Sequence, residues 1–173
     1  ERLMLNGEDK AKILHGNAER LLALDPGLTV FGAGEGGRAA AMLERDQASS
    51  SLGMVIDDID AGRATLSMIV RKDMLNGHGN CQGGFIFALA DSAFAFACNS
   101  RDQATVAAGC SIEYLVPVSE GERLTASATE RALVGRRGIY DVTVRDSAQN
   151  VVATFCGKSA SIKGTVLGMS GPD

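Results

Sequence analysis

Apolar and polar residues alternate along several segments of the chain, and this alternation predicts β-strands. The side chains of Ala64, Leu66 and Met68 are apolar, whereas the intervening Thr65 and Ser67 are polar. A period of two places the apolar side chains on one face of a half-buried strand. Strands are predicted over residues 52–59, 63–70, 105–116, 122–132, 138–145 and 151–162. Turn-like residues join most of them, which favours an antiparallel sheet.

One long segment, residues 85–99, is apolar nearly all round and carries a single charged residue, Asp91. A helix that is apolar on all sides is expected to be buried. A shorter helix is predicted over residues 38–48, and a polar loop over residues 71–82 leads into the long helix. This order of elements predicts the α+β class, with a curved antiparallel sheet wrapped around one long central helix.

The N-terminal residues 1–34 are predicted to lie outside the main fold, as a helix and a Gly-rich linker. Apolar residues recur at helical spacing between Ile13 and Leu22, and an Asp-Pro-Gly turn ends that pattern. The glycines of residues 32–37 lack the Gly-Lys-Ser/Thr sequence of a phosphate-binding loop and are interpreted as a linker. Residues 35–173 then form the main domain, with an irregular C-terminal tail.

Composition and charge argue against several classes of protein. The chain has 173 residues, about one domain, with 17 Lys and Arg against 21 Asp and Glu and a net charge of −4. This mildly acidic chain has no basic stripe, so neither a nucleic acid nor a membrane surface is expected as a partner. The longest apolar run is shorter than the about 20 residues of a membrane span, and no signal peptide is recognised. The four cysteines form no CxxC pair and are predicted to be reduced and mostly buried, as in a cytoplasmic protein.

Asp91 is the residue of the apolar helix that most needs an explanation. A buried carboxylate costs several kcal/mol unless it is paired or protonated. No cation stands three or four positions away, where the residues are Phe87, Ala88, Phe94 and Ala95. Two interpretations are open. In the first, Asp91 lies on an exposed seam or forms a hydrogen bond with a neighbouring loop. In the second, it is a general base or nucleophile whose pKa is tuned by a partly dehydrated site.

The start of the same helix offers backbone N–H groups. Gly83 and Gly84 either simply make the turn into the helix, or use the positive end of its dipole to polarise a carbonyl oxygen. Between Gly83 and Asp91 the helix rises about 12 Å, at about 1.5 Å per residue, so one carbonyl carbon cannot touch both. If both serve one reaction, they come from two copies of the chain related by a two-fold axis. This predicts a homodimer with two shared active sites and an inactive monomer.

The segment from Met74 to Ser100 closely resembles the phenylacetic-acid-degradation (PaaI-type) thioesterases of the hotdog superfamily. The likeness continues through Ile-Glu-Tyr-Leu-Val-Pro at 112–117, Gly-Ile-Tyr-Asp at 138–141 and Gly-Lys-Ser at 157–159, and covers roughly residues 38–168. It implies the hotdog fold, assembly into dimers and usually tetramers, and hydrolysis of acyl-CoA thioesters. Phenylacetyl-CoA and its ring-hydroxylated relatives are the implied substrates, and no metal or redox cofactor is implied.

The resemblance also implies roles for single residues. Asp91 corresponds to the carboxylate that activates water or attacks the thioester, Gly83 to the amide that polarises the carbonyl, and Asn76 to a loop residue that orients water or substrate. The expected substrate-binding residues are His78, Gln82 and Gly84 around the helix start, and Arg136, Arg137 and Lys158 as cations for the phosphates of coenzyme A.

One position departs from the family pattern. Members commonly carry His-Gly-Gly before the helix, where this chain has Gln82-Gly-Gly. Gln donates hydrogen bonds but does not titrate, so no role as an acid is expected at this position, and a non-catalytic acyl-CoA-binding protein stays an alternative. A hotdog hydratase is a second alternative, although no Asp–His pair of that type surrounds Asp91. Residues 1–27 separately resemble the C-terminal helix of metal-dependent amidohydrolases, but the barrel is absent, so no metal site is implied.

Overall fold

The computed structural model describes residues 42–166 and residue 168. The predicted N-terminal helix and linker, residues 1–34, lie outside the described residues. The elements follow in the order α3 (Gln47–Ser51), β1 (Val55–Asp60), β2 (Arg63–Ile69), a short 3-10 helix η1 (Lys72–Met74), α4 (Gly83–Asn99), β3 (Thr105–Tyr114), β4 (Arg123–Val134), β5 (Arg137–Arg145) and β6 (Val151–Ser161).

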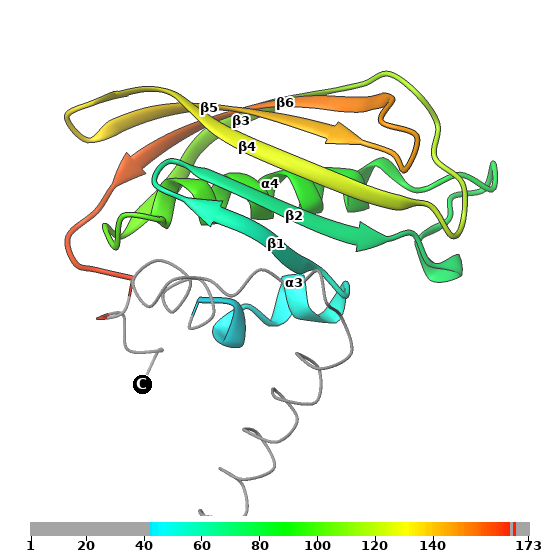
Figure 1. The fold of residues 1–173 in the computed structure, drawn as a ribbon, viewed down its shortest axis with the longest axis horizontal. Helices are drawn as coiled ribbons and strands as arrows, with labels where there is room; N and C mark the ends of the chain where they lie inside the picture. The colour runs from blue at the N-terminus through cyan, green and yellow to red at the C-terminus, as the bar shows by residue number, and fades with distance from the viewer. Residues whose placement is uncertain (1–41, 167, 169–173) are drawn as a thin grey trace, which may run out of the picture. The chain divides into compact units, whose positions relative to one another are not determined.

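The six strands form one sheet in the order β1-β2-β4-β5-β6-β3, and every neighbouring pair is antiparallel. The sheet curves around α4, which contacts all six strands (Figure 1). The predicted α+β class and the predicted arrangement, a curved sheet around one central helix, are confirmed. None of the helices formed by the described residues is long and apolar enough to span a bilayer.

The core lies between α4 and the inner face of the sheet. Leu89 and Phe94 of α4 are buried there, and the Phe94 ring meets Tyr140 of β5 edge-on, with the ring centroids 5.4 Å apart. Gly157 of β6 faces the same ring, and a Cβ at this position would lie 2.7 Å from the Phe94 ring. Glycine at residue 157 therefore lets the helix approach the sheet closely.

Three predicted boundaries are corrected by local hydrogen bonds. The predicted helix over 38–48 does not run on continuously: residues 42–45 are helical, and Asp46 then caps α3 by accepting a hydrogen bond from the Ser49 amide at 3.0 Å. Because α3 ends at Ser51, the first strand begins at Val55 rather than at residue 52. The loop over 71–82 is also more ordered than predicted, since it contains η1 and a β-bridge between residues 75 and 81.

The four cysteines are all free thiols. Cys81 and Cys98 are buried, Cys156 is partly buried and Cys110 is exposed. The prediction of mostly buried thiols is therefore wrong for Cys110, which lies on β3, the edge strand of the sheet.

Candidate active site

A tight loop before α4 is held by the side chain of Asn76. Its carboxamide oxygen accepts hydrogen bonds from the backbone amides of His78, at 2.9 Å, and Asn80, at 3.2 Å. The backbone N–H of Asn76 donates to the Asn80 carbonyl at 2.8 Å. The oxygen of the side chain is thus used by the loop, and no described residue accepts a hydrogen bond from its NH₂ group. That group is available to donate to a bound molecule.

The first turn of α4 has unpaired amides. Gln82 occupies the N-cap position with an extended backbone, and its side chain makes no capping hydrogen bond. Within residues 42–166, no acceptor pairs with the backbone N–H groups of Gly83 and Gly84. These donors stand at the positive end of a helix of 17 residues. An oxygen that carries partial negative charge is the group that such amides bind.

A pocket of about 420 Å³ opens at this end of α4. It brings together three of the predicted site residues, Asn76, His78 and Gly83. The sequence makes Tyr114 a candidate for lining an acyl pocket and places Cys81 near the site, and both line this pocket. The lining residues to which the sequence did not point are Asn80, Ile86, Leu115, Val116 and Pro117. Most of these come from the end of β3 and the segment after it, so the pocket has an apolar wall and a rim that bears amides and an imidazole.

Cys81 is the one thiol in this pocket lining. Its side chain is buried, and burial raises the pKa of the thiol above its usual value. A thiol with a raised pKa stays protonated at neutral pH and is a poor nucleophile. The chemistry of the pocket is therefore not expected to run through Cys81.

Asp91 does not line this pocket. It lies two turns further along α4, half-buried, and no described residue gives its carboxylate a hydrogen bond or an ion pair. Burial alone raises the pKa of Asp91 above the usual range of an aspartate. Its neighbours Ala88, Ser92 and Ala95 are also only partly buried, so they form an incompletely covered seam on the helix. An unpaired, partly dehydrated carboxylate is a stronger base than one in water.

The other predicted substrate-binding residues lie elsewhere. Gln82 and Gly84 are exposed at the start of α4 and do not line the pocket. Arg136 donates to the Ser161 carbonyl at 2.9 Å, and Arg137 pairs with Ala160 in the sheet. Lys158 lies on β6, as predicted, and is exposed.

The strand register separates the two arginines from the pocket of their own chain. Ser161 and Ala160 pair with the Thr105 end of β3, whereas the pocket lies at the Tyr114 end. At about 3.3 Å per residue, the length of β3 puts roughly 30 Å between these two ends. A single chain therefore does not bring Arg136 and Arg137 to its own pocket.

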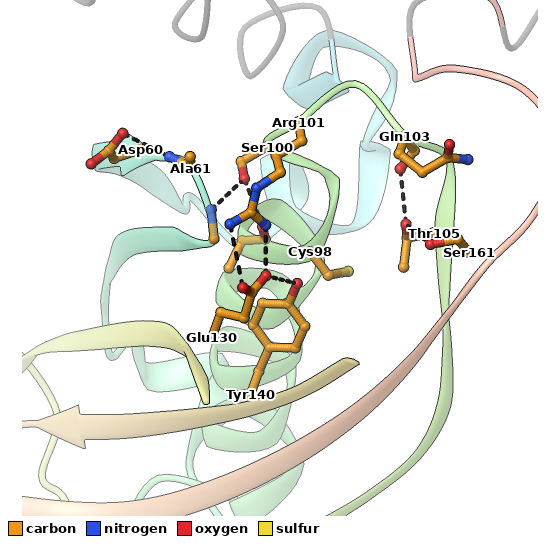
Figure 2. Close-up of polar contacts among 12 residues, drawn as sticks. Asp60, Ala61, Cys98, Ser100, Arg101, Gln103, Thr105, Glu130, Tyr140 and Ser161 are labelled. Carbon is orange, nitrogen blue, oxygen red and sulfur yellow. Dashed lines mark hydrogen bonds and ion pairs between the residues drawn. The ribbon is translucent and has the colours of Figure 1, made fainter. Parts of the chain in front are cut away.

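At the opposite end of α4, the side chains of Ser100, Arg101, Glu130 and Tyr140 are all hydrogen-bonded. Arg101 forms an ion pair with Glu130 of β4, with 2.6 Å between nitrogen and oxygen, and the Tyr140 hydroxyl donates to the same carboxylate at 2.9 Å (Figure 2). The Ser100 hydroxyl accepts from the Gly62 amide at 2.8 Å and ties the β1–β2 turn to the helix. This end of α4 is thus fixed to β4, β5 and the β1–β2 turn.

Comparison with known proteins identifies relatives over most of this domain. Residues 78–153 match the profile of the Thioesterase superfamily. The chain is 45% identical to the acyl-coenzyme A thioesterase PaaI of Escherichia coli strain K12 over 130 residues, which cover 75% of this chain and 93% of that protein. The structure of the E. coli PaaI protein from the phenylacetic acid degradation operon matches with a TM-score of 0.74, over 75% of this chain and 94% of that chain. A mutant form of the phenylacetic acid degradation protein PaaI from Thermus thermophilus matches with a TM-score of 0.65 at 38% identity, over 68% and 100% of the two chains. These matches confirm the hotdog fold.

Proposed function

The chain belongs to the PaaI-type acyl-CoA thioesterases of the Thioesterase superfamily, and we propose that its substrates are phenylacetyl-CoA and hydroxylated aryl-acetyl-CoA thioesters. The observation that carries the proposal is the uncapped start of α4, where two unpaired amides stand at a pocket with an apolar wall. Such a pocket suits an aromatic acyl group, and such amides suit a carbonyl oxygen that becomes negative during the reaction.

Hydrolysis needs a donor to the carbonyl oxygen and a base for water. The Gly83 N–H donates to the thioester oxygen and stabilises the charge that develops there as the carbonyl carbon is attacked. Asp91 takes a proton from the attacking water, or attacks the carbon itself to form an anhydride that water then cleaves. In either route the C–S bond breaks, the coenzyme A thiolate leaves and is protonated, and the aryl-acetic acid is released. The Asn76 NH₂ group, which no described residue uses, orients water or substrate.

The active site is shared between two copies of the chain. Gly83 and Asp91 of one helix are about 12 Å apart along its axis, which is too far for both to touch one carbonyl group. Strand β3 is an edge of the sheet, and Val106, Tyr114 and Leu115 along it and just after it are exposed apolar residues. A long exposed edge with apolar side chains is suited to pairing with another strand. An antiparallel pairing of β3 with its copy builds a dimer, and two dimers build a tetramer.

This dimer also gives the basic residues a role. A two-fold axis near the middle of β3 places the Thr105 end of one strand beside the Tyr114 end of the other. Arg136 and Arg137, which lie by the Thr105 end, then stand near the pocket of the neighbouring copy. Cations there bind the phosphates of a coenzyme A whose acyl group occupies that pocket, and Lys158 adds charge on the adjacent strand.

The test is thiol release from phenylacetyl-CoA, followed with a coloured thiol reagent, beside acetyl-CoA and a long-chain acyl-CoA. Asp91→Asn is expected to keep the native mass and to lose at least about 100-fold in kcat, because a general base contributes about 10²- to 10⁴-fold. Asp58→Asn, at an exposed carboxylate of β1, is the matched control and should leave turnover unchanged. Binding of phenylacetyl-CoA without thiol release would instead show a non-catalytic acyl-CoA-binding protein.

A further inference from the structure

Tyr114, the last residue of β3, contacts the first residue of α4 across 31 positions of sequence. Its hydroxyl donates a hydrogen bond to the Gly83 carbonyl at 2.9 Å. Its ring lies against the Gly83 backbone, since a Cβ built there would be 3.1 Å from the ring carbon that bears the hydroxyl. A larger residue at position 83 would displace the ring. Gly83 and Tyr114 therefore fit each other as a pair.

The start of α4 needs such a contact. Two consecutive glycines have more backbone freedom than any other dipeptide, and this helix has no side-chain cap to fix its first turn. The residue before them is held, because the Gln82 amide donates to the Met74 carbonyl at 2.8 Å. After it, the Tyr114 hydroxyl is the side-chain donor that holds the Gly83 carbonyl. The Gly83–Gly84 peptide unit is thus fixed from the strand side.

We propose that Tyr114 is a positioning residue for thioester hydrolysis, which holds the Gly83 and Gly84 amides in the direction that binds the developing oxyanion. The inference rests on the proposed function of the Gly83 amide. The Gly83 carbonyl and the Gly84 N–H belong to one planar peptide unit, so a hydrogen bond to the carbonyl orients that N–H and polarises it. Contact of the Tyr114 ring with the Gly83 backbone fixes the Gly83 Cα, which joins this peptide unit to the Gly83 N–H.

Two properties of Tyr114 suit this role. The end of its strand is anchored, because the next residue, Leu115, donates to the Val152 carbonyl at 2.8 Å. Partial burial raises the pKa of the Tyr114 hydroxyl, so it remains a protonated donor throughout the pH range of an enzyme assay. The side chain also lines the pocket, which places its ring beside the bound acyl-CoA without any need for the phenol to react.

The second tyrosine of the chain supplies a matched control. Tyr140 also donates one hydrogen bond of 2.9 Å, but to Glu130 at the other end of α4. Tyr114→Phe removes a hydroxyl at the Gly83 end of α4, where the pocket lies, and Tyr140→Phe removes one at the Asn99 end. Both variants keep the aromatic ring, so each removes one hydrogen bond without opening a large cavity.

The experiment measures kcat and KM for phenylacetyl-CoA hydrolysis, with native mass and Tm, in the wild type and both variants. Tyr114→Phe is expected to lower kcat about three- to tenfold with KM and native mass unchanged, since it misaligns donors that act in the transition state. Tyr114→Leu, which also loses the ring, should lower kcat further. Tyr140→Phe should keep kcat and lower Tm.

A spectroscopic measurement separates positioning from a merely structural role. In the Asp91→Asn background, the infrared stretch of the ¹³C-labelled thioester carbonyl of bound phenylacetyl-CoA reports the hydrogen bonds to its oxygen. Adding Tyr114→Phe is expected to shift this band toward that of the free thioester. Unchanged kcat and an unchanged band in the Tyr114 variants would overturn the role of Tyr114 and leave the proposed function standing. Absence of thiol release in the wild type and in Tyr140→Phe alike would overturn both.

Discussion

The two ends of α4 differ in how their polar groups are satisfied. At the Asn99 end, the Asn99 side chain bonds the backbone of Thr105 through both its nitrogen and its oxygen. Beyond it, Arg101 and Glu130 neutralise each other. At the Gly83 end there is no side-chain cap, and the first amides have no partner among residues 42–166.

One helix thus serves both stability and the proposed chemistry. Hydrogen bonds at the Asn99 end hold the helix to β3, β4 and the β1–β2 turn, whereas Tyr114, and no side-chain cap, holds its Gly83 end. The Gly83 end leaves its backbone N–H groups available to a ligand. Asp91, which is half-buried between the two ends, also lacks a hydrogen-bonding partner among the described residues. The unpaired amides of Gly83 and Gly84 and the unpaired carboxylate of Asp91 thus lie on one helix, where the reaction is proposed to occur.

The largest loss of activity is expected when the unpaired amide at the Gly83 end of α4 is removed. Gly83→Pro removes the N–H that is proposed to polarise the thioester, and proline is favoured at the first position of a helix. Gln82 already has the extended backbone that a following proline requires, and a Cβ at residue 83 would lie 3.1 Å from the Tyr114 ring, so the ring has to shift to admit the proline. We expect kcat to fall about 10²- to 10³-fold with the native mass retained, the usual cost of one oxyanion donor. Turnover equal to wild type would show that the amide at residue 83 does not bind the carbonyl.

The second prediction concerns the hydrogen bonds at the Asn99 end of α4. Glu130→Ala removes the acceptor shared by Arg101 and Tyr140 and leaves the Tyr140 hydroxyl without its partner. We expect the free energy of unfolding to fall by about 2 kcal/mol, as for hydrogen bonds to a charged group, while kcat changes by less than about twofold. Urea unfolding and the thiol-release assay measure the two quantities. A large loss of kcat in a folded variant would mean that the two ends are not separate in function.

The smallest expected effect concerns the stability cost of Asp91. Because burial raises the pKa of Asp91 in the folded chain, its contribution to stability is complete at low pH and is lost as the pH rises above about 4 and through the raised value. Asp91→Asn removes that loss and should raise Tm by about 2–4 °C at pH 7, although it inactivates the enzyme. At pH 3 the two proteins should melt alike. A Tm at pH 7 below that of the wild type would show instead that Asp91 has a stabilising partner in the assembled protein.

Much of the fold could be predicted because its signals are local. Alternating residues such as Ala64, Leu66 and Met68 are indeed buried on one face of β2, and the apolar run around Asp91 is the central helix. Boundaries were missed where one hydrogen bond decided them, as with the capping of α3 by Asp46.

The site could be predicted only in part. Its helix start and loop residues are contiguous in sequence, so Asn76, His78 and Gly83 were found together. Of the pocket wall, the sequence offered only Tyr114, as an aromatic residue. Leu115, Val116 and Pro117 were missed because their place in the wall depends on β3 returning to the start of α4. The contact between Tyr114 and Gly83 joins residues that no periodicity connects. The sequence of one chain does not indicate which residues a neighbouring copy contributes to the site. The one clue is the separation of Gly83 and Asp91 along the helix, which is too long for both to touch one carbonyl group.

The shared site can be tested most directly by mixing two inactive proteins. Gly83→Pro and Asp91→Asn chains are exchanged under conditions that allow dimers to re-form, and thiol release is then measured. If each site takes Gly83 from one chain and Asp91 from the other, half of the dimers are mixed and each carries one intact site, so about a quarter of wild-type activity returns. If both residues serve a site within one chain, every site keeps one defect. A mixture of exchanged chains that stays inactive would contradict the shared site.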